Sequence, residues 1–488
     1  LGDYINCASA YISKCLKFYF ALDILLNCHY MVILGFTVFA RLYYSKGTVI
    51  IEGDVSTPYG QWDLRVRAYR APACHYGDIR RYLKNSHIQF EDAVLKPPPA
   101  PAINGSVKLY PYQEEAFQRW VENGCRGIVC IATAGGKTFI GLKAVETLRQ
   151  ATLVLVPTLA LVDQWVQRIR EALGLEAGVY GGGKRELSWV TVSTYDSAYI
   201  HAEELGDKFS LLIADEVHHL FAPGYSHAIE MLAAPYRLGL TSTLHRADMR
   251  HLDAPRLIGS VVYEATHEEL TGTYIAPYVH QKVFVELTPQ EKAEYETHWC
   301  IYTSYLAQRG LEMKSELDFQ RLIKLSAFDP KAREALLARN RALKIALNSE
   351  AKMQFLAEQL KKSGEKTLIF TQFNSLVYAI SKRFLVPAIT HKTPEAERRL
   401  ILSRFRSGEY TTIVTSQVLD EGLDVPDASR GIVLSGTGSQ RQHIQRLGRL
   451  LRKSSSGKVA LLLEVVSKET KEIEISRRRK RKPENEDV

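Results

Sequence analysis

The sequence predicts an α/β protein with two lobes, each built on a parallel sheet. Short apolar, β-branched runs alternate with helical stretches between residues 127 and 240. This alternation is typical of strands buried between helices on both faces of a sheet. A second series of such runs follows between residues 367 and 465. Two series in one chain therefore indicate two sheets.

Composition sets the broad class. With 488 residues, 46% of them hydrophobic, the chain can bury several cores, and its length suggests two to four domains. Seven cysteines are scattered without a CxxC pair, which argues against a zinc site or a disulfide framework and fits a reducing compartment with mostly buried thiols. The net charge of +9 is a mild excess that suits a polyanionic partner.

Residues 1–40 form an apolar leader with three open interpretations. Residues 24–40 carry no charge, but Asn27 and His29 interrupt them, and the stretch is at the short limit for a membrane span. No small-residue cleavage site follows, and the first methionine is Met31. The leader is a non-native or mis-assigned segment, an extra helix packed on the fold, or a membrane segment; the natural start is expected at or near Met31.

The remaining chain divides at changes in composition. Residues 41–96 predict a small α/β module, and the proline run within 97–102 predicts a semi-rigid linker. The lobes follow at 103–270 and 271–476, and the basic and then acidic residues 477–488 predict an unpacked tail. The expected elements are strands at 48–52, 66–69, 153–156, 190–193, 211–214, 237–240, 281–287, 367–371, 412–415, 431–435 and 459–465, and helices at 76–83 and 114–121.

A charged helical insert, residues 289–348, interrupts the second lobe. Tyr295, Trp299, Tyr302 and Leu306 recur at helical spacing within it. The pattern predicts a surface helical hairpin with a buried aromatic stripe.

The first chemical motif is the loop after the strand at 127–132. Gly135 and Gly136 leave backbone N–H groups open to a polyphosphate, Lys137 supplies a cation, and Thr138 supplies a hydroxyl for Mg²⁺. A helix follows at once, with Phe139, Ile140, Leu142, Val145 and Leu148 expected on its buried face. Such a string also occurs by chance, so the other motifs decide the function.

Asp215 and Glu216 end an apolar strand, where α/β sheets place ligands. Asp215 is expected to hold Mg²⁺ through its water shell, and Glu216 to polarise the attacking water. An isolated Asp-Glu pair is usually solvated surface; four preceding apolar residues and the upstream phosphate loop favour catalysis.

A third motif lies at residues 442–452 in the second lobe. Arg449 and Arg452 stand three apart, so one helix face presents both guanidinium groups. Guanidinium groups that reach a transferring phosphoryl group contribute about 10³ to 10⁵ in rate. The alternative is a basic surface helix without a catalytic role.

Together these motifs resemble those of superfamily 2 helicases: the phosphate loop, residues 215–218, residues 241–243 and residues 445–449 stand where motifs I, II, III and VI are found. Residues 109–113, 193–199 and 416–426 and the helical insert make the resemblance closer, to the archaeal form of the XPB DNA helicase. It covers residues 41–479 and implies two RecA-like lobes, a damage-recognition-like module at 41–96 and a thumb at 289–348.

The resemblance also implies roles for single residues. Gln113 would read the adenine edge, Thr133 and Ala134 would belong to the ATP loop, and Gln445 would act beside Arg449. Glu421, Gly422 and Asp424 would couple the lobes and help bind the sugar and the metal shell. The residues implied to contact nucleic acid are Pro157, Thr158, Thr194, Thr371, Arg246 and Asp248.

The implied activity is ATP- and Mg²⁺-dependent 3′–5′ movement along DNA, acting at single-strand/duplex junctions in excision repair, transcription or both. A nuclease partner, and for eukaryotic relatives a transcription and repair complex, belong to the same implication. A cytoplasmic location near the nucleoid of a prokaryotic or archaeal cell, without stable membrane association, is expected.

Three departures from the family pattern bear on the activity. Ala134 replaces a glycine, and if the position requires a left-handed backbone the substitution costs roughly 1 to 2 kcal/mol of conformational free energy. Tyr110 replaces an arginine, and Ala247 replaces the acid of an Arg-Glu-Asp motif linked to unwinding. Two alternatives therefore stay open: a duplex translocase that remodels DNA without processive unwinding, and a nucleotide-gated DNA-binding scaffold.

Overall fold

The computed structural model describes residues 39–53, 55–132, 135–242, 244, 250–270, 273–274, 278–313, 316–362, 365–416, 428–436 and 459–478. The leader 1–38 lies outside them. The described residues within Leu1–Val129, Thr138–Leu240 and Leu244–Tyr263 form one compact unit, and those within Cys130–Lys137, Thr241–Thr243 and Glu264–Val488 form the second. No helix in the described part of the chain is long and apolar enough to cross a membrane.

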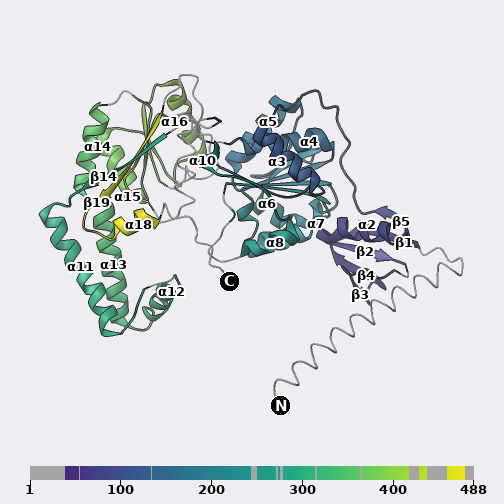
Figure 1. Ribbon diagram of the computed structural model, residues 1–488, viewed down its shortest axis with the longest axis horizontal. Helices are drawn as coiled ribbons and strands as arrows, with labels where there is room; N and C mark the ends of the chain where they lie inside the picture. The colour runs from purple at the N-terminus through teal and green to yellow at the C-terminus, as the bar shows by residue number, and fades with distance from the viewer. Residues whose placement is uncertain are drawn as a thin grey trace, which may run out of the picture. The chain divides into compact units, whose positions relative to one another are not determined.

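The N-terminal module is a five-stranded sheet in the order β3-β4-β2-β1-β5, with a helix packed on it (Figure 1). The predicted strand at 48–52 and the predicted helix are confirmed. The strand expected at 66–69 begins later, at Ala68, because Arg67 has a left-handed backbone with φ +50°. Strand β1 starts two residues before the expected module boundary, and its Ala40 is fully buried. The module's elements are β1 (Phe39–Ser45), β2 (Thr48–Glu52), β3 (Gln61–Asp63), β4 (Ala68–Pro72), η1 (Ala73–His75), α2 (Tyr76–Asn85) and β5 (Gln89–Ala93).

An eight-stranded sheet forms the first lobe, in the order β13-β6-β12-β11-β7-β10-β8-β9. Strands β12, β11, β7, β10 and β8 pair in parallel, as predicted. Its strands are β6 (Arg126–Ile131), β7 (Thr152–Val156), β8 (Gly178–Gly181), β9 (Lys184–Arg185), β10 (Val190–Thr194), β11 (Leu211–Asp215), β12 (Tyr236–Thr241) and β13 (Val261–Ala265).

Helices cover both faces of this sheet. Figure 1 shows α3, α4 and α5 on one face and α6 and α8 on the other. The helices are α3 (Pro111–Glu122), α4 (Lys137–Leu148), α5 (Leu159–Leu173), α6 (Tyr195–Ile200), α7 (Ala202–Leu205), η2 (Val217–His219), α8 (Pro223–Glu230), η3 (Arg250–Asp253), α9 (Ala254–Leu257) and α10 (His267–Leu270).

The module packs against the loop before β12. Ala233 belongs to the module's apolar core, and the Tyr44 hydroxyl donates to the Met231 carbonyl at 3.1 Å. A Cβ on Gly206 would lie 1.8 Å from that hydroxyl oxygen, so only glycine fits. The fully buried Arg237 guanidinium holds the loop by donating to the carbonyls of Leu232, Ala234 and Leu257 at 2.6 to 2.9 Å. Burial lowers the pKa of Arg237 to about 10.

The second lobe has a six-stranded sheet in the order β14-β19-β18-β15-β17-β16, with every pair parallel. Each strand predicted for it is confirmed within a few residues. Its elements are β14 (Tyr278–Val285), α14 (Glu350–Lys362), β15 (Thr367–Phe370), α15 (Asn374–Phe384), β16 (Ala388–Ile389), α16 (Glu395–Ser407), β17 (Thr412–Thr415), β18 (Arg430–Val433), β19 (Ala460–Ser467) and α18 (Glu472–Arg478). Helix α18 extends two residues into the expected tail.

The insert is the predicted helical hairpin. Helices α11 (Pro289–Gln308) and α13 (Pro330–Leu347) lie side by side, with α12 (Glu316–Leu325) at the end away from the sheet (Figure 1). Tyr295 and Tyr302 are buried against alanines of α13, and Trp299 stacks on Tyr295 at 6.0 Å between ring centroids. Small residues on α13 thus leave room for the aromatic stripe, which is confirmed.

Candidate nucleotide and nucleic-acid site

The phosphate loop joins the end of β6 to the start of α4. Gly136 has φ +70°, a left-handed conformation that glycine adopts without strain. At Gly135 a Cβ would lie 2.4 Å from Ile131 Cγ2 and 2.9 Å from the Ala132 carbonyl oxygen. The loop therefore requires both glycines, and it delivers Lys137 and Thr138 to the first turn of α4, where helix N–H groups and the helix dipole favour an anion.

Two side chains of α4 differ from their expected places: Leu148 is only half-buried, and Phe139 is exposed. Phe139 is 37% exposed, and the Arg168 guanidinium lies over its ring at 5.3 Å. The buried residues of the helix are Ile140, Gly141, Leu142, Ala144 and Val145. The prediction for Phe139 was wrong because the true core face contains the two small residues, which an apolar count overlooks.

The acidic pair stands at the carboxyl end of β11. Asp215 is 6% exposed, and its carboxylate accepts hydrogen bonds from the Trp165 indole N–H and from the Glu216 backbone N–H, both at 2.9 Å. The Tyr195 hydroxyl donates to the Asp215 carbonyl oxygen, also at 2.9 Å. The orientation of the Asp215 side chain and of the peptide after it is thus set by neighbouring groups.

Glu216 has a left-handed backbone, φ +48° and ψ +52°. For a residue with a Cβ this conformation costs about 1 to 2 kcal/mol, and such strain concentrates at functional sites. One Glu216 carboxylate oxygen lies 3.5 Å from Nδ1 of His218, which is 1% exposed. The two carboxylates thus have different neighbours, since that of Asp215 bonds Trp165 and that of Glu216 lies near His218.

The threonines assigned to nucleic acid in the first lobe cap helices. The Thr158 hydroxyl oxygen accepts from the Leu161 N–H at 3.4 Å, and that of Thr194 accepts from the Ser197 N–H at 3.2 Å. Both lie at the carboxyl ends of parallel strands, since Pro157 and Thr158 follow β7 and Thr194 is the last residue of β10. Thr194 is only 7% exposed, so its side chain lies mostly among other residues of the protein.

Gln113 is 2% exposed at the third position of α3, and its amide oxygen accepts from the Tyr110 N–H at 2.9 Å. This reciprocal cap, with Pro111 as the first helical residue, explains why α3 starts earlier than expected. Adenine recognition by Gln113 stays a prediction.

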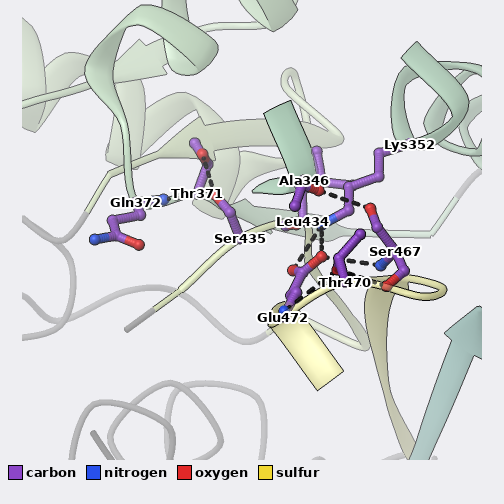
Figure 2. A network of polar contacts seen from close by, with 9 residues as sticks. All are labelled: Ala346, Lys352, Thr371, Gln372, Leu434, Ser435, Ser467, Thr470 and Glu472. Carbon is purple, nitrogen blue, oxygen red and sulfur yellow. Dashed lines mark hydrogen bonds and ion pairs between the residues drawn. The ribbon is translucent and has the colours of Figure 1, made fainter. Parts of the chain in front are cut away.

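In the second lobe, Thr371 follows β15 and is fully buried. Its hydroxyl bonds the Ser435 hydroxyl at 2.8 Å, and Ser435 also accepts from the Gln372 N–H at 3.0 Å (Figure 2). Thr371 thus fixes two strand ends, and a direct contact to nucleic acid by its hydroxyl stays a prediction.

Beside these residues lies a buried ion pair. The Lys352 ammonium donates to both carboxylate oxygens of Glu472 and to the Leu434 carbonyl, each at 2.7 Å (Figure 2). Glu472 further accepts from the Ser467 N–H at 2.9 Å. This pair was not predicted from the sequence, and neither were the roles of Trp165 and Tyr195. Tyr195 lies within the motif at 193–199, and Trp165 is on the buried face of α5.

Several predicted residues lie outside the described part of the chain, so their roles stay predictions. They are Thr133, Ala134, Arg246, Ala247, Asp248, Glu421, Gly422, Asp424, Gln445, Arg449 and Arg452.

Family models match three segments. "Xeroderma pigmentosum group B helicase damage recognition domain" matches residues 42–94, "Type III restriction enzyme, res subunit" matches 106–246, and "ERCC3/RAD25/XPB C-terminal helicase" matches 333–482. Among solved structures, the Hef helicase domain of Pyrococcus furiosus aligns with 75% of this chain and 97% of its own length, at a TM-score of 0.51 and 19% identity. This likeness shows the helicase fold.

Curated relatives give the finer assignment. The chain is 46% identical to the DNA 3′–5′ translocase XPB2 of Sulfurisphaera tokodaii over 90% of its own length and 99% of the relative. It is 31% identical to the DNA 3′–5′ helicase XPB of Kineococcus radiotolerans, over 76% of this chain and 62% of that protein. The chain spans 46% of the XPB/SSL2 subunit of transcription and repair factor IIH from Saccharomyces cerevisiae, at 30% identity. The extent of the first match leaves one conclusion: the chain belongs to the XPB family of DNA helicases and translocases.

Proposed function

We propose that this chain hydrolyses ATP to move 3′ to 5′ along DNA and to open the duplex. The observation that carries the proposal is the 46% identity to XPB2 of Sulfurisphaera tokodaii across nearly the whole of that protein. The glycine-built phosphate loop and the strained Asp215–Glu216 turn support it, since an ATP-driven motor needs both.

In this proposal the phosphate loop binds the polyphosphate. Gly135 and Gly136 let the backbone approach it, with Thr133 and Ala134 in the same loop, and Lys137 neutralises its charge. Gln113 recognises adenine. Gly422 and Asp424 complete the sugar and metal surroundings from the second lobe.

Mg²⁺ is the expected metal. Proteins usually hold Mg²⁺ with one or two oxygen ligands while the nucleotide phosphates and waters supply the rest. The buried Asp215 carboxylate and the Thr138 hydroxyl are the proposed ligands, and the ion would neutralise charge on the phosphates.

Glu216 is the proposed base, which accepts a proton from the attacking water. Arg449, Arg452 and Gln445 would stabilise charge on the transferring phosphoryl group. The proposed nucleic-acid contacts are the start of α5 at Pro157 and Thr158, the Thr194 turn, the Thr371 turn, and Arg246 with Asp248.

A second candidate is a duplex translocase that remodels or opens DNA without processive unwinding. It is favoured by a specific observation, because the relative at 46% identity is named a translocase while the one at 31% is named a helicase. In either case the biological setting would be repair or transcription on chromosomal DNA in the cytoplasm, with a nuclease partner for strand incision.

The test measures ATP turnover without nucleic acid and with single-stranded DNA, duplex DNA and RNA. Strand-displacement and triplex-displacement assays then run on the same preparation. DNA-stimulated turnover with strand displacement supports the helicase, and triplex displacement alone supports the translocase. No response of turnover to DNA would leave the nucleotide-gated scaffold, for which Ala134 is the sequence argument.

Ala247 offers a finer test of unwinding. Because exposed ion pairs contribute under about 1 kcal/mol, restoring the missing acid in Ala247→Glu should not alter folding. We expect DNA-stimulated turnover within about two-fold and more strand displacement per ATP. Equal displacement yield at matched turnover and DNA affinity would make the alanine a neutral substitution.

A further inference from the structure

Two aromatic side chains hold Asp215 from opposite faces of the first sheet. Trp165 lies on α5 and Tyr195 on α6, and Figure 1 shows these helices on the two sides of the sheet. Each side chain is at most 3% exposed, and each ends in a donor that bonds Asp215 at 2.9 Å. An aromatic ring with one polar tip can fill a core and still reach a polar group.

The Trp165 indole also touches the helix that carries the phosphate loop. A Cβ on Gly141 of α4 would lie 2.7 Å from Trp165 Cη2, so the glycine makes room for the ring. Glycine inside a helix costs about 1 kcal/mol relative to alanine. The ring is thus packed between α4 and the Asp215 carboxylate, and a shift of α5 would move the indole N–H relative to that carboxylate.

Tyr195 acts on the next peptide. Its hydroxyl bonds the Asp215 carbonyl, which belongs to the same peptide group as the Glu216 N–H, and that N–H bonds the Asp215 carboxylate. The peptide leading into the left-handed Glu216 is therefore held at both of its polar atoms.

Both helices begin at residues proposed to meet nucleic acid. Thr158 caps α5 two turns before Trp165, and Thr194 caps α6 immediately before Tyr195. A movement at either cap therefore passes along a helix, which is stiff over this distance, to a hydrogen bond on Asp215.

We propose that Trp165 and Tyr195 are positioning residues that transmit nucleic-acid contact at Thr158 and Thr194 to the Asp215–Glu216 pair. The inference rests on the proposed function and adds the route by which DNA accelerates ATP hydrolysis. Trp165 sets the direction of the Asp215 carboxylate, and Tyr195 sets the peptide that directs Glu216.

The test compares two variants that remove the donor. Trp165→Phe deletes the indole N–H together with one ring, which is why it needs a control with the same loss of volume, and Tyr195→Phe deletes the hydroxyl with almost no change in volume. Matched controls are Trp120→Phe, whose indole N–H bonds the buried Arg237 carbonyl at 2.9 Å, and Tyr76→Phe, whose hydroxyl bonds Asp92 in the N-terminal module at 2.8 Å. The full chain is used, at one salt concentration.

We expect the turnover number at saturating duplex DNA to fall about ten-fold in each test variant, as for other groups that orient metal ligands. KM for ATP and Kd for DNA should stay within about two-fold, and the double variant should lose less than the product of the single losses. The controls should retain the wild-type ratio of DNA-stimulated to basal turnover.

The possible results distinguish a failure of the proposed function from a failure of the proposed roles of Trp165 and Tyr195. If wild-type turnover does not respond to DNA, the proposed function fails and the inference fails with it. If wild type responds and both test variants match their controls, the inference alone is wrong. A loss explained by weaker DNA or ATP binding would also overturn it. Tyr195→Phe decides the matter should Trp165→Phe not fold.

Discussion

For the buried ion pair of the second lobe, we expect the free energy of unfolding to differ strongly between a variant with one partner replaced and a variant with both replaced. Lys352 is 1% exposed and Glu472 fully buried, and the ammonium donates three hydrogen bonds of 2.7 Å, two of them to the carboxylate. Lys352→Met removes the cation and leaves the Glu472 charge in the interior. Breaking one partner of such a pair costs about 3 to 5 kcal/mol.

The double variant Lys352→Met/Glu472→Leu removes both charges and keeps apolar volume. Replacing a buried pair by apolar side chains is often close to neutral, so we expect its free energy of unfolding within about 1 kcal/mol of wild type. The coupling energy between the two sites is then about 3 kcal/mol or more. For a lobe of this size each kcal/mol shifts Tm by about 2 to 4 °C, so the single variant should melt about 10 °C lower.

Urea unfolding of the full chain measures these values, with hydrogen exchange in β18 and β19 to assign the transition to the second lobe. The matched control is Lys468→Met, whose partner Glu286 also lies 2.8 Å away but whose pair is exposed (48% and 76%). That control should lose under about 1 kcal/mol. The reasoning is refuted if Lys352→Met loses no more than the control, or if the double variant is as unstable as the single.

Three further predictions concern catalysis, docking and the tail. Glu216→Gln should lower ATP turnover by orders of magnitude with ATP affinity within a few-fold, whereas Lys137→Ala should weaken ATP binding; near-normal turnover in Glu216→Gln would remove the proposed base. The pKa of His75 is raised to about 9 by the Asp78 carboxylate, 3.6 Å from its Nδ1, and by Cys74. The contribution of protonated His75 to the free energy of unfolding is therefore complete below pH 6.5 and is lost as pH rises through 9. After discounting for solvent screening it amounts to about 1 to 2 kcal/mol. Thermal unfolding of wild type and of His75→Gln between these pH values measures it. Truncation after residue 478 removes four Lys and Arg, and the salt slope of duplex binding should fall by about 0.9 for each phosphate that these side chains neutralise; an unchanged slope would leave a solvated tail or an address signal.

Local patterns carried most of the strand and helix predictions. Strands β7, β10, β11, β15 and β17 are runs of mostly buried apolar or β-branched residues, and the aromatic spacing in α11 requires one buried face, so the signal for each lies within a short window. The acidic pair was recognisable because Asp215 and Glu216 follow four buried residues of β11. Here the sequence neighbourhood and the structural environment coincide.

Contacts between distant residues could not be predicted in this way. Lys352 and Glu472 are 120 residues apart, and a charged residue in a helix is ordinarily exposed, so no local pattern marks their burial. Strand β5 was missed because most of its residues are exposed or half-buried at a sheet edge. Trp165 lies among the buried residues of α5, and a periodic apolar pattern reports burial but not the hydrogen bond at the tip of the ring.

The two ends of the strands in the first sheet have different neighbours. Asp215 lies at the carboxyl end of β11, and the phosphate loop follows the carboxyl end of β6. The N-terminal module instead meets the amino ends of β6 and β12: Asp78 pairs with Arg126, the first residue of β6, at 3.5 Å, and the loop held by Arg237 precedes the core of β12.

The amino and carboxyl ends of β12 are separated by six residues, which at about 3.3 Å per residue is roughly 15 to 20 Å of strand. The last five residues of β12 are buried, and a strand packed in this way does not slide or bend over that length without breaking its packing. In the proposed route, nucleic acid acts on Asp215 through the helix caps at Thr158 and Thr194 and the side chains of Trp165 and Tyr195. This route does not include the module's contacts at the amino ends of β6 and β12.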